Sequence, residues 1–320
     1  MYKLIAIAKN TFVETLRQPV YAVIVATAML LFVVSPSLSM YTMDDDNKLL
    51  REIGLSTLFL TSLFIAIFSA SGAVSVELEN KTILTVLTKP VQRPIFLLAK
   101  FLGVVGAVAL GHYLGTVALL MTIRHGVLST ASDTHDWTVL GSAIGVLVVT
   151  VLLSAFFNFA YDWKFTSTAI VIAAILATFV LVFLALIDRD WNFAPDKNGL
   201  NRLDIYGSVL LFLGAVIIAA LAVTISARFN LIVTLSACIG VFLLGLVSDY
   251  VFGRFADTYL WARIGRFLVP NLQVFWISDA IYEGSVVPFR YILITASYAL
   301  CYTAGILALA IALFQRRQVG

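Results

Sequence analysis

Charged residues are scarce in this chain. Asp, Glu, Lys and Arg make up 12% of its 320 residues, while hydrophobic residues make up 61%. Soluble domains are roughly a quarter charged. A water-soluble fold of this size could not hide so much apolar surface, because a large part of any domain's surface stays exposed. This scarcity excludes an ordinary soluble protein and predicts membrane lipid as a partner. The net charge of +3 comes from scattered Lys and Arg, so no nucleic-acid partner is expected.

Motifs for enzymatic chemistry are also missing. The sequence has no Gly-Lys dipeptide, which excludes a P-loop, and no Gly-x-Ser-x-Gly elbow. It has no His-Glu-x-x-His and no Cys-x-x-Cys, and its two cysteines, Cys238 and Cys301, lie in apolar stretches. We therefore expect no enzyme activity, no catalytic residue, no metal and no cofactor on this chain.

Long hydrophobic runs take the place of charge. A helix needs about 20 apolar residues to cross roughly 30 Å of hydrocarbon. The runs are continuous rather than alternating, so helices are expected and barrel strands are not. The sequence predicts an all-α integral membrane protein, with one transmembrane domain over residues 1–320. Its eight predicted spans are 20–40, 55–76, 101–123, 139–160, 166–187, 205–227, 231–252 and 290–314.

The distribution of tryptophan and of positive charge indicates how the spans are oriented. Trp137, Trp163 and Trp191 each fall at the end of a span, as expected for interfacial anchors. Lys and Arg cluster before the first span, around residues 81–100 and at the C-terminus. By the positive-inside rule these clusters favour cytoplasmic termini. We expect an integral protein of a bacterial inner membrane with both termini cytoplasmic.

Two amphipathic segments lie outside the spans. Residues 1–19 carry Leu4, Ile5, Ala8, Phe12 and Leu16 at helical spacing, which predicts an interfacial helix ending before Pro19. Residues 253–289 carry two amphipathic stretches, 260–267 and 274–281, separated by a proline. They predict an exterior helical hairpin before the last span.

The segment 77–100 joins the second and third spans. Polar residues at its start and apolar residues at helical spacing predict a short cytoplasmic helix ending near Lys89, because the residue before a proline avoids the α region. Pro94 suits the first turn of the next helix. The prediction is a short helix, a turn, and a helix running into the third span.

Few polar groups interrupt the spans. His112 lies in the middle of the third span. An ionisable group there is either functional or hydrogen-bonded to a neighbouring helix, and the hydrogen-bonded role is the favoured interpretation. Asp249 lies near a span end. His125, Asp133, His135 and Asp136 share an exterior loop and could ligate a metal, but solvated side chains are the favoured interpretation. The spans offer too little charge to couple an ion gradient to transport.

A stripe of small residues follows one face of the third span at steps of four. Such a stripe lets another helix approach closely. That helix belongs either to the same subunit, which is the default expectation, or to a second copy. The stripe comprises Gly103, Ala107, Gly111 and Gly115.

The stretch 76–93, VELENKTILTVLTKPVQR, resembles the segment after the second span in permease subunits of the second ABC exporter class (ABC type-2 permeases). The resemblance rests on Glu77, Glu79, Thr82, Leu87, Lys89, Pro90 and Arg93, followed by Lys100. Residues 9–19 are similar to the family's elbow helix, with Phe12, Glu14 and Arg17 as the matched positions. Lys81 stands where many members have Gly, a variant of the branch associated with maturation of multicopper enzymes.

The resemblance implies a function for the chain. It would be the membrane subunit of an ATP-driven exporter, with segment 77–100 as the coupling helix. Two copies of a separate ABC ATPase would bind the ATP and Mg, and two permease copies would form a homo- or heterodimer. The family usually has six spans, and eight are predicted here. The alternatives are a secondary transporter or channel that uses His112 and Asp249, and a non-transporting membrane scaffold.

Overall fold

A computed structural model describes residues 2–39, 46–75, 92–128, 134–283 and 285–315, and over these residues helices are the only regular elements. The long helices are α1 (Tyr2–Arg17), α2 (Pro19–Ser39), α3 (Asp46–Ala70), α6 (Arg93–His125), α7 (Trp137–Tyr161), α8 (Phe165–Leu186), α9 (Arg202–Ser226), α10 (Leu231–Leu246) and α14 (Phe289–Gln315). The short elements are a π-helical turn η1 (Ser71–Ser75), η2 (Pro195–Lys197), α11 (Ser248–Val251), η3 (Gly253–Phe255), α12 (Leu260–Leu268), η4 (Gln273–Phe275) and α13 (Ser278–Tyr282).

Seven of the eight predicted spans are continuous helices long and apolar enough to cross a membrane: α2, α3 with η1, α6, α7, α8, α9 and α14. This confirms an all-α membrane protein. The remaining span, predicted over 231–252, is instead a bent pair, because α10 and the segment after it differ in direction by 67°. It counts as an eighth span only if the pair is taken as one.

A tertiary contact explains the break after α10. The Leu272 N–H donates to the carbonyl of Gly245 at 3.0 Å, in place of the next turn of the same helix. The returning chain also packs closely here, because a Cβ on Gly245 would lie 2.8 Å from the carbonyl oxygen of Pro270. Nothing in the local sequence, such as a proline, marks this position, so the continuous run of apolar residues predicted a straight helix.

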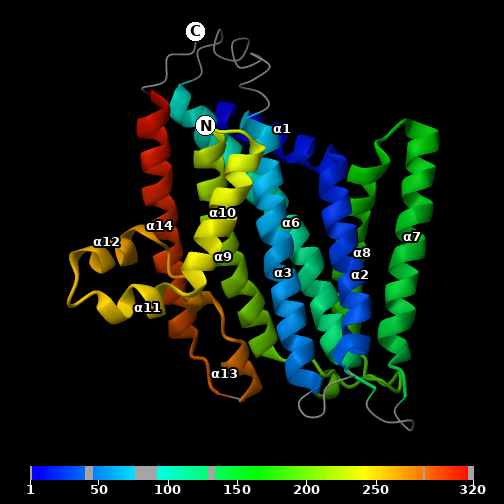
Figure 1. The fold of residues 1–320 in the computed structure, drawn as a ribbon. Helices are drawn as coiled ribbons and strands as arrows, with labels where there is room; N and C mark the ends of the chain where they lie inside the picture. The colour runs from blue at the N-terminus through cyan, green and yellow to red at the C-terminus, as the bar shows by residue number, and fades with distance from the viewer. Residues whose placement is uncertain (1, 40–45, 76–91, 129–133, 284, 316–320) are drawn as a thin grey trace.

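The helices form a bundle centred on α3, α6 and α9 (Figure 1). In the most apolar stretch of α3, 72% of residues are buried, against 17% in α7 and 22% in α8. The α7–α8 hairpin therefore stands at the side of the bundle. Helix α1 crosses one end of the bundle, and α14 finishes at that same end (Figure 1).

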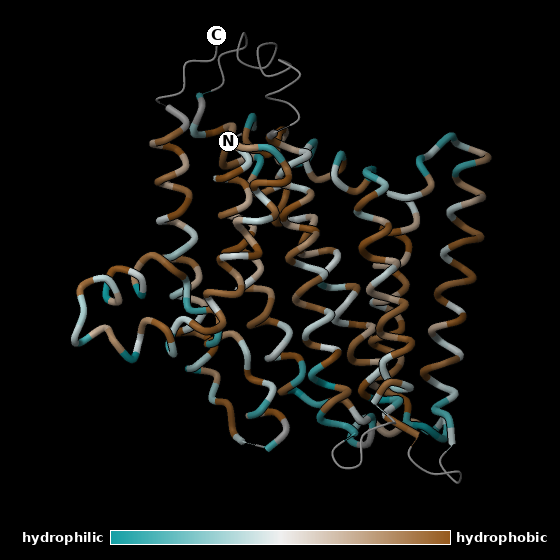
Figure 2. The backbone as a smooth tube through the Cα atoms, in the orientation of Figure 1, coloured by the Kyte–Doolittle hydropathy of each residue, from teal (hydrophilic) through white to brown (hydrophobic). Residues whose placement is uncertain are grey.

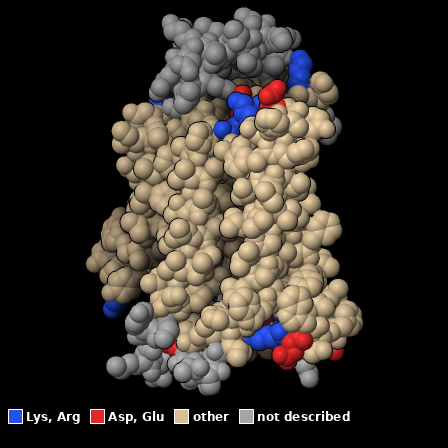
Figure 3. Space-filling model, turned by 90° about the vertical axis from the view of Figure 1, so that its right-hand side faces the viewer, with Lys and Arg blue, Asp and Glu red and all other residues tan. Residues whose placement is uncertain are grey.

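Along the long helices, charge lies near the two ends of the bundle. Brown, apolar backbone fills the middle of the long helices in Figure 2. On the face shown in Figure 3, Lys, Arg, Asp and Glu gather at the top and bottom, with an uncharged band between them. Such a band is the surface that a bilayer covers.

In the exterior hairpin predicted over 253–289, only the first arm is one continuous helix. Helix α12 covers the first stretch, while the second stretch is divided between η4 and α13 with Trp276 extended between them. Phe275, Ile277 and Ile281 are all buried, and they pack against Gly207 and Gly214 of α9. Packing onto α9 thus replaces the regular amphipathic helix that the sequence predicted.

Candidate coupling site and buried polar clusters

The segment predicted to couple to an ATPase falls largely on residues that the structure leaves undescribed. Glu77, Glu79, Thr82, Leu87, Lys89 and Pro90 all lie within 76–91, outside the described residues. The structure resumes at Gln92, whose extended backbone precedes α6, and Pro94 lies in the first turn of that helix. The seventh predicted coupling residue, Arg93, is the first residue of α6.

Helix α1 packs tightly across the first part of α6. Thr11 and Thr15 are each only 1% exposed. A Cβ on Gly103 would lie 2.6 Å from the Thr11 Cβ and 2.7 Å from the Ala8 carbonyl oxygen. The contact face of α1 combines these hydroxyl side chains with part of the predicted apolar face, since Leu16 is buried and Ala8 meets α6, while Ile5 is 60% exposed. Apolar periodicity did not single out Thr11 and Thr15, because close backbone approach selects for small side chains.

The three residues matched to the elbow helix have different environments. The Phe12 ring packs over Gly106 of α6, where an added Cβ would meet it at 3.2 Å. Glu14 and Arg17 are exposed on the outer side of α1. Lys100, which ends the matched stretch, is buried in α6 with its Nζ 5.6 Å from the centre of the Phe96 ring.

The link between α1 and α2 also contacts the end of α3. Gln18 packs on Gly72 in the π-helical turn η1, so closely that a Cβ on Gly72 would lie 2.6 Å from its Nε2 atom. Isolated π-helical turns are rare and occur often at functional sites. Together, α1 and Gln18 contact both helices that flank the undescribed segment 76–91.

The small-residue stripe of α6 packs inside the subunit. Gly103 faces α1, Gly111 faces Ile65 and Tyr21, and Gly115 faces Leu58 and Phe32. Ala107 is fully buried, and its carbonyl accepts a 2.8 Å hydrogen bond from the Tyr21 hydroxyl. The stripe is therefore occupied by α1, α2 and α3 of the same subunit.

His112 joins three helices in the middle of the bundle. Its Nδ1 lies 2.7 Å from the Ser62 hydroxyl of α3, and its Nε2 lies 3.0 Å from the carbonyl oxygen and 3.1 Å from the hydroxyl of Ser208 in α9. Thr116, one turn along α6, lies 2.6 Å from the Ser208 hydroxyl. The imidazole is 5% exposed and packs on the Phe212 ring at 5.4 Å.

A neutral imidazole satisfies this network in either tautomer. With the proton on Nε2, the ring donates to the Ser208 carbonyl and Nδ1 accepts from Ser62. With the proton on Nδ1, the ring donates to Ser62 and Nε2 accepts from the Ser208 hydroxyl. Both nitrogens are bonded in each case, and buried polar groups require such partners. The geometry favours His112 as an uncharged connector between helices.

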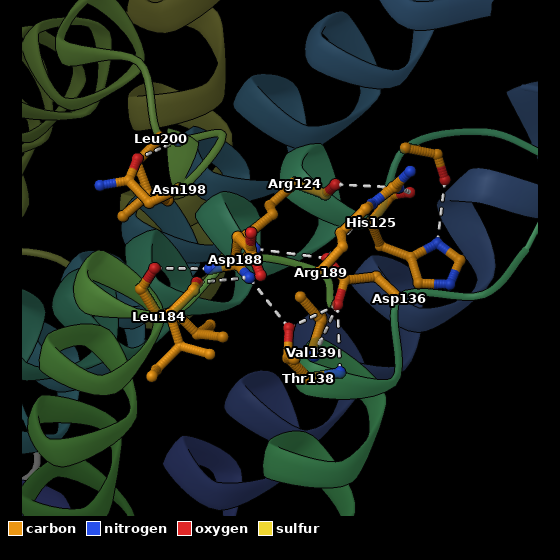
Figure 4. Close-up of polar contacts among 12 residues, drawn as sticks. Arg124, His125, Asp136, Thr138, Val139, Leu184, Asp188, Arg189, Asn198 and Leu200 are labelled. Atoms are coloured by element: carbon orange, nitrogen blue, oxygen red, sulfur yellow. Dashed lines mark hydrogen bonds and ion pairs between the residues drawn. The ribbon is translucent and has the colours of Figure 1, made fainter. Parts of the chain in front are cut away.

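A charged cluster lies at the C-terminal end of α6, away from α1 and at the open end of the α7–α8 hairpin (Figure 4). The Arg124 Nε lies 3.3 Å from the Asp136 carboxylate, and both side chains are at most 2% exposed. Arg189 approaches the same carboxylate at 3.4 Å from the loop after α8. Arg124 also donates to the carbonyls of Leu184 and Ile187. This clasp therefore ties α6 to both helices of the hairpin.

Asp136 is also the N-cap of α7. Its carboxylate accepts from the backbone N–H groups of Thr138 and Val139 at 3.1 and 3.2 Å. Burial by itself would raise the pKa of this carboxyl, but the hydrogen bonds from Thr138 and Val139 and the charge of Arg124 outweigh burial and hold the pKa below its ordinary value of 3.8. Asp136 is thus ionised at neutral pH.

The lowered pKa of Asp136 predicts acid-sensitive stability. A carboxyl whose pKa is lower in the folded state contributes stability that is present above its unfolded-state pKa and is lost as the pH falls through its folded-state pKa. We expect this contribution to be intact at about pH 7 and to fall away below about pH 4. Melting temperatures of the protein in nanodiscs, measured across this range, test the point. Asp190→Asn, in an exposed turn, should keep the acid-dependent loss, and a flat profile would contradict the prediction.

The sequence only weakly indicates this clasp. It predicts Asp136 as one member of a loop that could ligate metal, and it does not predict Arg124 or Arg189 as partners of that carboxylate. Asp136 directly precedes an apolar run, with Thr138 two residues later, which is an N-cap signal. The described part of the loop brings His125 and His135 together at 3.4 Å, and no group of three or more potential metal ligands occurs among the described residues. Asp133 lies outside them.

Comparisons with protein-family models, with curated proteins and with solved structures find no match to this chain.

Proposed function

We propose that this chain is the membrane-spanning permease subunit of an ATP-driven exporter of the ABC type-2 class. The observation that carries the proposal is the packing of α1. This helix lies across the end of the bundle and contacts the start of α6, while the adjoining Gln18 contacts the end of α3. Residues 77–92, which resemble the family's coupling segment, connect those same two helices.

This arrangement suits the transfer of motion into the membrane. Gly103 and Gly106 hold α1 in van der Waals contact with α6, so a force on α1 must move α6 or separate the two helices. The exposed Glu14 and Arg17 remain available on the outer side of α1. In this proposal α1 is the elbow helix, and segment 77–100 docks on the ATPase through Glu77 and Glu79.

The two spans beyond the family's usual six lie at the side of the bundle, which is compatible with the proposal. The family usually has six spans, and the two least buried helices here are α7 and α8, which pack mainly on each other. Apart from α7 and α8, the spans are α2, α3, α6, α9, α14 and the bent α10, counted with the segment after it as one span. We therefore interpret α7–α8 as an addition beside a six-span core.

The remaining parts of the proposal concern partners and location. ATP and Mg would be bound by two copies of a separate ATPase, and a second permease copy would complete a homo- or heterodimer. The end of the bundle that carries α1 and the finish of α14 would face the cytoplasm of a bacterial cell. The transported substrate would be exported across the inner membrane, with the re-entrant region α11–α13 on the exterior side.

Association with an ATPase is the direct test. The chain, purified with a tag from its native membrane, should bring down an ABC ATPase. Glu77→Lys combined with Glu79→Lys should reduce the recovered ATPase at least about tenfold, since reversing two charges at a docking surface opposes its electrostatic complementarity. Glu283→Lys, exposed at the opposite end, should not change the recovery.

Three outcomes would count against the proposal. The first is the absence of any ATPase with the wild-type chain. The second is transport in ATP-free proteoliposomes driven by an ion gradient and abolished by His112→Ala, which would support a secondary transporter. The third is normal assembly without any flux of substrate, which would indicate a scaffold.

A further inference from the structure

The bundle divides into a first half, formed by α2, α3 and α6, and a second half, formed by α9, α10 and α14. The two halves must move together if the bundle is driven from one end. Helices α2, α3 and α6 contact α1 or the link that follows it, whereas α14 packs mainly on α9, and α10 packs on both α9 and α3. Most contacts between α9 and its neighbours are apolar, including those of Leu210, Leu211 and Ile218. Close packing at Gly207 and Gly214 holds α9 against Leu55 and Phe59 of α3. The hydrophobic effect is not directional, however, so apolar contacts do not by themselves fix how α9 is aligned along its neighbours.

The His112 cluster supplies a directional link at this boundary. One imidazole on α6 is bonded to α3 through Ser62 and to α9 through Ser208. Thr116 adds a second bond from α6 to the Ser208 hydroxyl. A sliding movement of α9 would leave these buried polar groups without partners, which is costly in a dry interior. The bonds therefore oppose independent movement of α9.

We propose that His112 is a positioning residue that makes α9 follow α3 and α6, so that motion started at α1 reaches the second half of the bundle. This inference rests on the proposed function, because it requires an ATPase that drives α1. It assigns His112 no proton transfer. The imidazole acts by being bonded on both sides, and its role is mechanical.

The cluster offers a matched pair of substitutions. His112→Phe keeps a ring of similar size and removes both nitrogens, while Ser62 can turn its hydroxyl to the Leu58 carbonyl, 2.9 Å away. Ser208→Ala removes a hydroxyl from the same cluster but leaves the backbone carbonyl that Nε2 contacts at 3.0 Å. The inference predicts loss of coupling in the first variant and retention in the second. His112→Asn, which reaches Ser62 but is too short for Ser208, is the alternative if His112→Phe does not fold.

The experiment follows two distances in the complex of the chain with its co-purified ATPase, in nanodiscs, before and after addition of ATP and vanadate. Spin labels at Ile5 and Phe165 report on α1, and labels at Val33 and Val209 report on α9; all four side chains are exposed. In the wild type and in Ser208→Ala, both distances should change. In His112→Phe and His112→Asn, the α1 distance should still change and the α9 distance should not.

The outcomes separate the two proposals. If the α9 distance changes in His112→Phe and His112→Asn as it does in the wild type, the positioning role of His112 is overturned while the permease function stands. If the wild-type chain recovers no ATPase, or if neither distance responds to ATP, the proposed function fails and the inference fails with it. Retained ATPase binding and an unchanged α1 response in the variants exclude simple misfolding, which would disturb both.

Discussion

Asp136→Asn is expected to destabilise the protein by about 3 kcal/mol or more, because it leaves a buried guanidinium without its counter-charge. Arg124 has a side chain only 2% exposed, and Asp136 is the carboxylate that both Arg124 and Arg189 approach. After the substitution, two positive charges would face each other across a neutral amide. Thermal unfolding of purified protein in nanodiscs, followed by intrinsic tryptophan fluorescence, measures the effect.

The matched control is Asp190→Asn, which removes the same charge from an exposed turn of the adjacent loop. It should change stability by less than about 0.5 kcal/mol. Arg124→Lys should not restore wild-type stability, because one ammonium cannot reproduce the contacts of Arg124 with Asp136, Thr138 and two carbonyls. Equal melting temperatures for wild type and Asp136→Asn would mean that the clasp contributes little to stability.

Gly103→Val is expected to displace α1 from α6. Its Cβ would fall 2.7 Å from the Ala8 carbonyl oxygen, which is backbone and cannot turn aside, so the helices must separate. Overpacking of this kind costs about 1–3 kcal/mol. The distance between spin labels at Ile5 and Leu102, both exposed, should increase, and co-purification of an ATPase should fall if α1 takes part in docking.

Gly145→Val in α7 is the control for this substitution. Nothing lies within 4 Å of a Cβ built on Gly145, so the same change in side chain should neither move α1 nor lower the melting temperature. An unchanged distance between α1 and α6 in Gly103→Val would show that the contact is looser than the structure has it. The two glycines differ only in what surrounds them, which makes the comparison a direct test of packing.

The contrast between these glycines illustrates what a sequence can and cannot specify. Gly103 and Gly145 both lie in apolar helices, and both belong to pairs of glycines or small residues four apart. Spacing predicted that the stripe from Gly103 to Gly115 would admit another helix. Only the structure identifies that helix as α1 at Gly103 and as α2 and α3 farther along, because a contact partner distant in sequence leaves no mark on the local pattern.

The polar clusters show the same division. Burial of His112 followed from its place in an apolar run, and bonding to a neighbouring helix was the favoured interpretation. Its partners, Ser62 and Ser208, are separated from it by 50 and 96 residues and were unpredictable. The clasp of Arg124, Asp136 and Arg189 was missed because arginines near span ends are ordinarily read as interfacial, and pairing depends on how the hairpin α7–α8 folds back.

By itself, the sequence determined that this is an all-α membrane protein, and it located seven continuous spans. These follow from local physics, because lipid requires continuous apolar helices of fixed length. The tertiary structure alone decided where α10 breaks, that Thr11 of α1 packs on Gly103, and which helices His112 joins. Each of these depends on a hydrogen bond or a close approach between segments far apart in the chain, and no local pattern of residues encodes it.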